Sequence, residues 1–202
     1  RVQASDYLIY HFMEMPKVSC KKVILSCHET EVYNIRKKNT SFDTIHYVSQ
    51  FQKDWQALNG TVIPNVISPL RPKLKSDFRV AGILGSIDRN KRVVESISRA
   101  LEDNITDIRL YGNVSDMEYF MHEVVPLLGG NVCYRGVYTN PQQVYDSLTH
   151  VYHSPKLETY NMIKPECQAA GVTYMGLEGN DTQAEVWNDD RIFEAWKTLL
   201  LS

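Results

Sequence analysis

Residues 78–102 decide the fold, and they read FRVAGILGSIDRNKRVVESISRALE. The part 78–85 is a continuous apolar run that ends in glycine, which is typical of a strand buried on both faces. The part 88–102 has its apolar residues on one stripe of a helix: Val93, Val94, Ile97 and Leu101. The stretch therefore predicts a strand followed by a helix, the basic unit of a parallel α/β sheet.

The same alternation continues to the C-terminus. Further strands are expected at 107–113, 131–137, 150–155 and 172–176, with helices between them at 116–128, 140–149 and 163–171. Asn140 is placed to cap the start of one helix and Gly171 to close another. Five such units in order predict a complete, Rossmann-like, doubly wound parallel sheet of the α/β class. The last helix, 189–201, is amphipathic.

The N-terminal third predicts only part of a similar domain. Short apolar runs lie at 7–12, 21–29, 43–49 and 61–67. The stretch 68–77, with two prolines and three basic residues, reads as a linker. We therefore predict a partial first lobe over 1–67, the linker 68–77 and a C-terminal lobe over 78–202, whose final helix packs back on the first lobe. Since the chain starts at Arg1, further domains of a longer chain are an open alternative.

Composition and charge exclude several classes. The 202 residues are 43% hydrophobic and 23% charged, which suits a globular protein. A net charge of −2 argues against a nucleic-acid binder. We see no secretion leader and no apolar run of about 18 residues, and the four cysteines form no CxxC pair. These features favour a cytoplasmic protein with reduced thiols.

Polar side chains gather after the strands of the C-terminal lobe, where ligands of doubly wound sheets bind. Cationic groups follow the first strand, and carboxylates follow the fourth. Lysine, arginine and helix N-termini hold phosphate, whereas carboxylates accept hydrogen bonds from vicinal hydroxyls. The sequence therefore favours a ligand with both a phosphate and a sugar. The candidates are Ser86, Arg89, Lys91, Val137, Glu158 and Glu166.

The segment 158–166, ETYNMIKPE, resembles the E-x7-E motif of GT-B glycosyltransferases, especially the retaining family 4. The surrounding segments HVYHSPKLETYNMIKPECQAAGV, ILGSIDRNKRVVESISRAL, TVIPNVI and DYLIYHFMEMP are similar to the family in the same order. The resemblance implies GT-B architecture: two Rossmann-like lobes, with the nucleotide-sugar donor held by the C-terminal lobe. It covers nearly the whole chain.

The resemblance also assigns roles to the donor-binding residues. Glu166 would hold the ribose hydroxyls, and the backbone at Val137 would meet the base. The backbone near Asn161 and Met162 would cradle the diphosphate at a helix N-terminus. The family usually has arginine at the position of Ser86, and Arg89 is the expected substitute.

Three residues are assigned to catalysis by the same resemblance. Lys91 would neutralise the leaving diphosphate. Glu158 would contact the donor sugar, and His11 of the first lobe would lie near the reacting sugar and the acceptor. The family run E-G-F-G is E-T-Y-N here, so two glycines that allow close backbone approach are absent.

The leading hypothesis is a retaining glycosyltransferase that takes a UDP- or GDP-linked sugar and needs no metal or other cofactor. Its acceptor is a glycan, a lipid or a protein. Two alternatives stay open: a non-catalytic nucleotide-sugar-binding or scaffolding module, and a nucleotide-sugar epimerase. The basic clusters Arg36–Lys38 and Arg71–Lys75 are mainly expected to be solvated, with peripheral membrane contact as the alternative.

Overall fold

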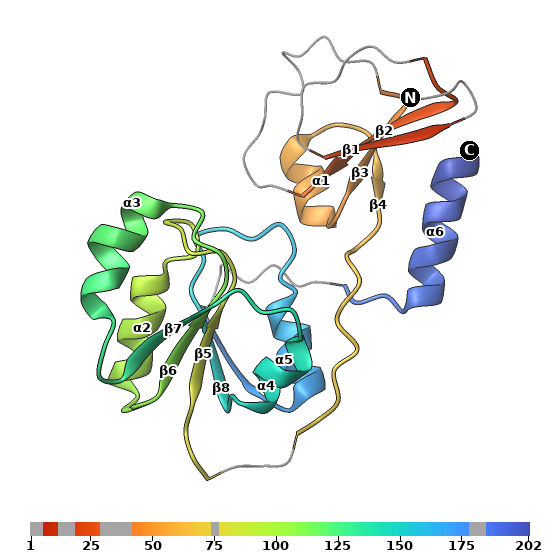
Figure 1. The fold of residues 1–202 in the computed structure, drawn as a ribbon. Coiled ribbons are helices and arrows are strands. Elements are labelled where there is room, and N and C mark those ends of the chain that lie inside the picture. Colours follow the sequence, from red (N-terminus) through yellow and green to blue (C-terminus); the bar gives the residue numbers. More distant parts are fainter. Residues whose placement is uncertain (1–5, 12–18, 29–41, 74–76, 178–184) are drawn as a thin grey trace. The chain divides into compact units, whose positions relative to one another are not determined.

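The computed structural model describes residues 6–11, 19–28, 42–73, 77–177 and 185–202 (Figure 1). The chain divides into two compact units. The first comprises residues 1–66 together with 182–202, and the second comprises residues 67–181. Each unit carries its own parallel sheet and its own apolar core.

The second unit contains a five-stranded parallel sheet in the order β7-β6-β5-β8-β9. Its strands are β5 (Ala81–Leu84), β6 (Ile108–Tyr111), β7 (Val132–Gly136), β8 (His150–His153) and β9 (Thr173–Gly176). The sheet is parallel and doubly wound, as the sequence predicts. Because β5 has β6 on one side and β8 on the other, the chain reverses direction across the sheet between β5 and β8, which is the topological switch point.

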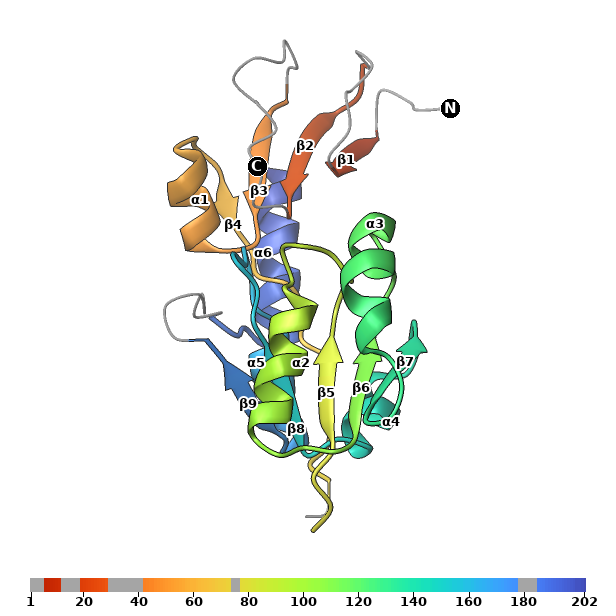
Figure 2. The same cartoon turned by 90° about the vertical axis from the view of Figure 1, so that its left-hand side faces the viewer.

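Helices cover both faces of this sheet (Figures 1 and 2). They are α2 (Val93–Glu102), α3 (Met117–Tyr119), α4 (Pro141–Asp146) and α5 (Ile163–Ala170). One face packs against α2 and α3 around Ile97 and Leu110. The other packs against α4 and α5 around Leu148 and Cys167. With both faces covered, the central strand β5 is apolar and buried throughout, as its sequence indicates.

Two helices differ from the sequence prediction for local reasons. The helix expected over 88–102 begins only at Val93, because Asp88 Oδ1 accepts the Lys91 N–H at 2.8 Å and Arg92 has a left-handed φ of 51°. The helix expected over 116–128 continues from α3 as a π-helical turn, 120–124, and a 3₁₀ turn, 125–127. Pro126 lies in the latter turn and has no N–H to continue an α-helix.

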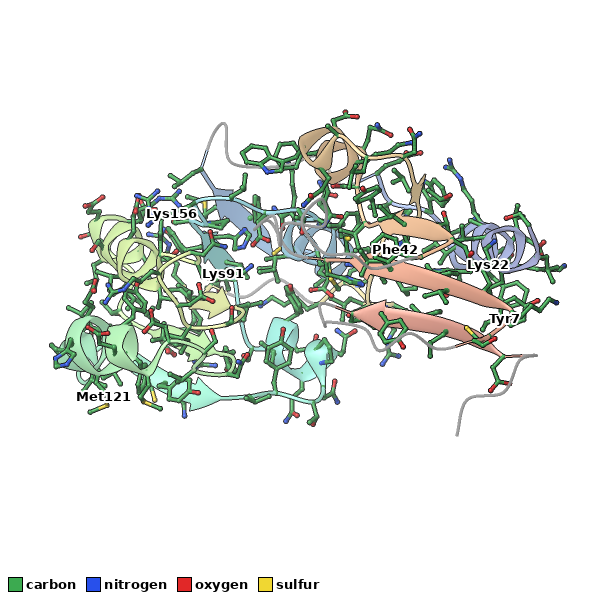
Figure 3. All side chains as sticks on the ribbon, turned by 90° about the horizontal axis from the view of Figure 1, so that it is seen from above. Tyr7, Lys22, Phe42, Lys91, Met121 and Lys156 are labelled. Atoms are coloured by element: carbon green, nitrogen blue, oxygen red, sulfur yellow. The ribbon has the colours of Figure 1, made fainter. Side chains whose placement is uncertain are left out.

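The first unit contains a parallel sheet in the order β1-β2-β3-β4. Its elements are β1 (Tyr7–His11), β2 (Lys22–Cys27), β3 (Thr44–Tyr47), α1 (Gln50–Gln56), β4 (Thr61–Val62) and α6 (Asp189–Leu201). The final helix belongs to this unit, since Ile192 and Leu199 pack against Ile24 and Ile63. Lys22 lies beside α6 in Figure 3, and its ammonium group donates a hydrogen bond to the Leu199 carbonyl.

The unit boundaries differ from those drawn on the sequence. In the stretch predicted as a linker, Ser68 donates to Glu166, and the Lys73 ammonium donates to the Leu148 carbonyl. Leu70 packs in the core of the second unit. Residues 68–73 therefore belong to the second unit, while 74–76 lie outside the described ranges. The C-terminal segment from 182 onward belongs to the first unit.

Candidate functional site

The carboxyl ends of β5 and β8 meet at the switch point of the second sheet. Gly85 follows β5 with a left-handed φ of 120°, and a Cβ there would lie 3.8 Å from Lys91 Cε. The lysine side chain therefore lies over the glycine turn, and Figure 3 shows it at the end of β5. The turn after β6 packs against the turn after β5, because Gly112 lies directly against the Gly85 carbonyl.

Asp88 organises the loop between Gly85 and α2. Its Oδ2 accepts from Ser86 Oγ at 2.6 Å and from Ser115 Oγ at 3.1 Å, while its Oδ1 holds the Lys91 N–H. The Ser86 hydroxyl is thus used within the loop. These hydrogen bonds fix the backbone from which the Lys91 side chain extends.

Lys91, Glu158 and His153 form a cluster across the switch point, which we call the ionic cluster. Glu158 Oε1 pairs with Lys91 Nζ and lies 3.1 Å from His153 Nε2. The side chains are 23% exposed for Lys91, 12% for Glu158 and 4% for His153. Burial alone would raise the pKa of Glu158, but the hydrogen bond from His153 and the charge of Lys91 outweigh it and hold that pKa below its usual value.

Hydrogen bonds extend this cluster to the start of α5. His153 Nδ1 lies 3.1 Å from the Tyr174 hydroxyl, which accepts from Asn161 Nδ2 at 2.8 Å. Asn161 Oδ1 accepts the Lys164 N–H at 3.2 Å, in the first turn of α5. The predicted diphosphate cradle at Asn161 and Met162 is thus joined to Lys91 through side chains of β8 and β9.

Glu166 occupies a second, separate group in the first turn of α5. It is 6% exposed, accepting from Ser68 Oγ at 2.6 Å and from the Tyr145 hydroxyl at 2.8 Å. Burial, with the nearby Cys167 and Glu166, raises the pKa of Tyr145 far above its usual value, so the hydroxyl stays a donor. Burial and Glu166 also raise the pKa of Tyr138, which follows β7 beside the exposed residue Val137.

The remaining predicted residues lie outside these two groups. Arg89 is about half exposed and pairs with Glu123 and, at 3.5 Å, with Asp116. It is therefore engaged on the α3 side of the loop. His11 belongs to the first unit, where it ends β1 at an exposed position and its ring centroid lies 5.2 Å from that of His28.

A chain of hydrogen bonds, which we call the histidine chain, lies at the strand ends of the first unit. His46 Nε2 donates to the Ile63 carbonyl at 2.7 Å. Burial lowers the pKa of His46 to about 4, so the ring is neutral and its Nδ1 accepts from Ser26 Oγ at 2.8 Å. Since the Ser26 proton is used there, Ser26 Oγ accepts from His28 Nε2 at 2.9 Å.

The sequence did not single out His153, Tyr174, Tyr145 or Ser68. A signal existed for His153, because it lies in the expected strand 150–155 and precedes Glu158 by five positions. Tyr145 of α4 and Ser68, before β5, reach Glu166, and Tyr174 of β9 reaches His153, so no sequence spacing connects these three residues to their partners.

Two features are absent from the described ranges of the chain. Within them, no group of three or more histidine, cysteine or acidic side chains is placed to hold a metal ion. None of the helices there is long and apolar enough to cross a membrane. The basic cluster 36–38 and Lys75 lie outside the described residues, so peripheral membrane contact stays a prediction.

Comparisons with solved structures give the fold. AviGT4, a glycosyltransferase involved in avilamycin A biosynthesis, is 20% identical with a TM-score of 0.64, over 95% of this chain and 64% of its own. WaaG, a glycosyltransferase involved in lipopolysaccharide biosynthesis, is 12% identical with a TM-score of 0.62, over 98% and 70%. HepE of Anabaena, solved with UDP-glucose, is 13% identical with a TM-score of 0.62, over 78% and 53%.

These likenesses show that the chain has the parallel α/β fold of GT-B glycosyltransferases. The chain spans less than two thirds of the length of AviGT4 and about half that of HepE. No family model matches the chain, and no curated protein matches it in sequence.

Proposed function

We propose that the chain is a glycosyltransferase or a part of one, and that its second unit binds the nucleoside-diphosphate sugar from which a glycosyl group is transferred. The observation that carries this proposal is the ionic cluster at the switch point. It combines a partly exposed lysine with a carboxylate, next to the start of α5. A diphosphate needs a cation and backbone N–H donors; in this proposal Lys91 supplies the cation and the start of α5 supplies the donors.

In this proposal Glu166 takes the ribose. Its two oxygens already accept from two hydroxyl groups, of Ser68 and Tyr145, which is the pattern that vicinal sugar hydroxyls would present. Lys91 would stabilise the negative charge that develops on the diphosphate as the sugar leaves. Glu158 would meet the donor sugar and His11 the reaction centre. Retention of configuration and independence of metal are parts of the same proposal, supported by the sequence resemblance alone.

Calorimetric titration with UDP, GDP and their glucose conjugates tests donor binding. Binding of one nucleotide is expected, with about tenfold weaker affinity in Lys91→Met and in Glu166→Gln, because each removes one charged hydrogen bond. Lys156→Met is the matched control, since Lys156 is exposed in the loop before Glu158. Absence of binding by the wild-type chain, or equal losses in the control, would contradict the proposed site.

Turnover separates the proposal from its two alternatives. Incubation with UDP-glucose is expected to release UDP slowly even when water is the only acceptor. Conversion of the UDP-sugar to its isomer without UDP release would instead identify an epimerase. If the chain binds the nucleotide but releases no UDP and forms no epimer, across a panel of glycan acceptors, it would be identified as a non-catalytic binding module.

A further inference from the structure

Glu158 has two partners of different character. Lys91 extends from a loop and is 23% exposed, whereas His153 ends a central strand and is 4% exposed. The strand ends around His153 are fixed in turn, because the Arg99 guanidinium donates to Ser154 Oγ and to the carbonyls of Met175 and Gly176. The lysine is thus the partner that can move, and the histidine is the one that stays.

The hydrogen bonds around His153 have a consistent direction. The ionised Glu158 can only accept, so His153 Nε2 carries a proton toward it. The Tyr174 oxygen accepts from Asn161 Nδ2, and its own proton can go to His153 Nδ1 at 3.1 Å. A neutral His153 therefore satisfies both of its nitrogens, and its N–H points at the carboxylate whether or not Lys91 is present.

This arrangement matters when a ligand competes for Lys91. A diphosphate at the start of α5 would attract the Lys91 ammonium away from Glu158. A buried carboxylate that loses its last donor is strongly destabilised. Because His153 remains, Glu158 keeps a donor, and the lysine can exchange partners at lower cost.

We propose that His153 is a positioning residue, whose Nε2–H holds the Glu158 carboxylate in place while Lys91 turns to the diphosphate of a nucleoside-diphosphate ligand. The inference rests on the proposed function of the second unit, since it takes that ligand class as given. His153 itself is not assigned a contact with the ligand.

UDP affinity, measured by calorimetry, tests the exchange of partners. His153→Leu is expected to weaken UDP binding about tenfold. His153→Gln, which keeps an N–H near the Nε2 position, is expected to retain most of the affinity. His150→Leu is the matched control, because His150 lies at the opposite end of the same strand, bonded to Thr149.

A double-mutant comparison separates positioning from a general loss of structure. In a Lys91→Met background, His153→Leu is expected to cause little further loss, since no lysine remains to exchange. An undiminished loss in that background, or a glutamine variant as weak as the leucine variant, would overturn the proposal. If His153→Leu does not fold, Tyr174→Phe replaces it. A smaller loss of UDP affinity is then expected, and an unchanged UDP affinity would contradict the inference.

A second readout needs no nucleotide. Carbon NMR of ¹³C-labelled glutamate, assigned with Glu158→Gln, follows the titration of the Glu158 carboxyl. Its pKa is expected to rise in His153→Leu and less in His153→Gln. If wild-type chain fails to bind UDP, the proposed function fails, while this titration still decides the role of His153. An unchanged Glu158 pKa in the leucine variant would overturn that role.

Discussion

The two units place different chemistry at the same position of similar sheets. In the first unit, the histidine chain consists of hydrogen bonds among uncharged groups, ending at the Ile63 carbonyl. In the second unit, the ionic cluster holds a lysine and a carboxylate, both partly buried. Both sheets place polar side chains at the ends of their parallel strands. The charge of those side chains then decides whether a charged ligand can bind there.

The largest expected effect separates the two units by their stability. In Gly112→Ala, the added Cβ would lie 1.7 Å from the Gly85 carbonyl oxygen, at a φ of 145°. We expect the second unit to lose more than about 4 kcal/mol of unfolding free energy, because backbone rather than a side chain must move. Hydrogen exchange measured by mass spectrometry would localise the loss to residues 67–181.

Gly136→Ala is the matched control for this change. Gly136 also has a left-handed φ, of 78°, but its Cβ would meet nothing within 4 Å. We expect a cost of only about 1–2 kcal/mol, from the backbone conformation alone. Equal losses in both variants would show that the contact between the turns after β5 and β6 does not matter.

Acid is expected to weaken the first unit through His46. Burial lowers its pKa from 6.5 to about 4. Below pH 6.5 His46 is protonated in the unfolded chain but stays neutral in the folded chain. The free energy of unfolding is therefore greatest above pH 6.5 and falls as the pH drops toward 4. The loss amounts to about 3 kcal/mol. The pKa of Glu158 is lowered in the folded chain, so its contribution to the free energy of unfolding is present above its usual pKa of 4.5 and is lost only at lower pH.

Tryptophan fluorescence isolates this effect. All three tryptophans, Trp55, Trp187 and Trp196, belong to the first unit, and the ring centroids of Trp196 and His46 lie 4.5 Å apart. Denaturant unfolding followed by fluorescence from pH 7.5 to pH 4.5 measures the change. His46→Gln is expected to be less stable at neutral pH but to lose this dependence. A dependence that persists in the variant would assign the effect to other groups, such as His28.

A smaller effect is expected at Glu166. Tyr145→Phe removes one of its two donors inside the core, and we expect the second unit to lose about 1–3 kcal/mol. In a Glu166→Gln background the loss is expected to shrink, because an amide oxygen attracts the hydroxyl less strongly than a carboxylate. Thermal unfolding of the four proteins gives this comparison, and equal losses in both backgrounds would contradict it.

The smallest effect is expected for Arg89→Ala. The side chain is about half exposed, and its partners Glu123 and Asp116 lie at the surface of the second unit. Exposed ion pairs contribute little. We expect UDP affinity to stay unchanged, in contrast to Lys91→Met. A loss as large as that of the lysine variant would instead place Arg89 at the diphosphate.

The fold of the second unit was predictable because each element carries a local signal. Apolar runs marked the five strands, and Asn140 caps its helix as expected, accepting from the Gln143 N–H at 3.2 Å. Gly171 closes α5 with a left-handed φ of 67°. The start of α2 was not predicted, since a side chain of the loop, Asp88, competes for the Lys91 N–H.

The candidate site was predictable only in part. The sequence singled out Glu158 and Glu166 as candidates through their resemblance to the E-x7-E motif. The sequence could not show that each carboxylate has its own partners. Those partners come from segments far apart in the chain, such as Ser68 for Glu166 and Lys91 for Glu158.

The sequence by itself thus determined the two parallel sheets, the order of strands and helices, and the residue types available at the strand ends. These follow from local periodicity and capping, which act over a few residues. Only the tertiary structure decided that His153 and Lys91 share Glu158, and that Ser68 and Tyr145 share Glu166. Such pairings depend on which strands become neighbours, and sheet order is set by packing of the whole domain.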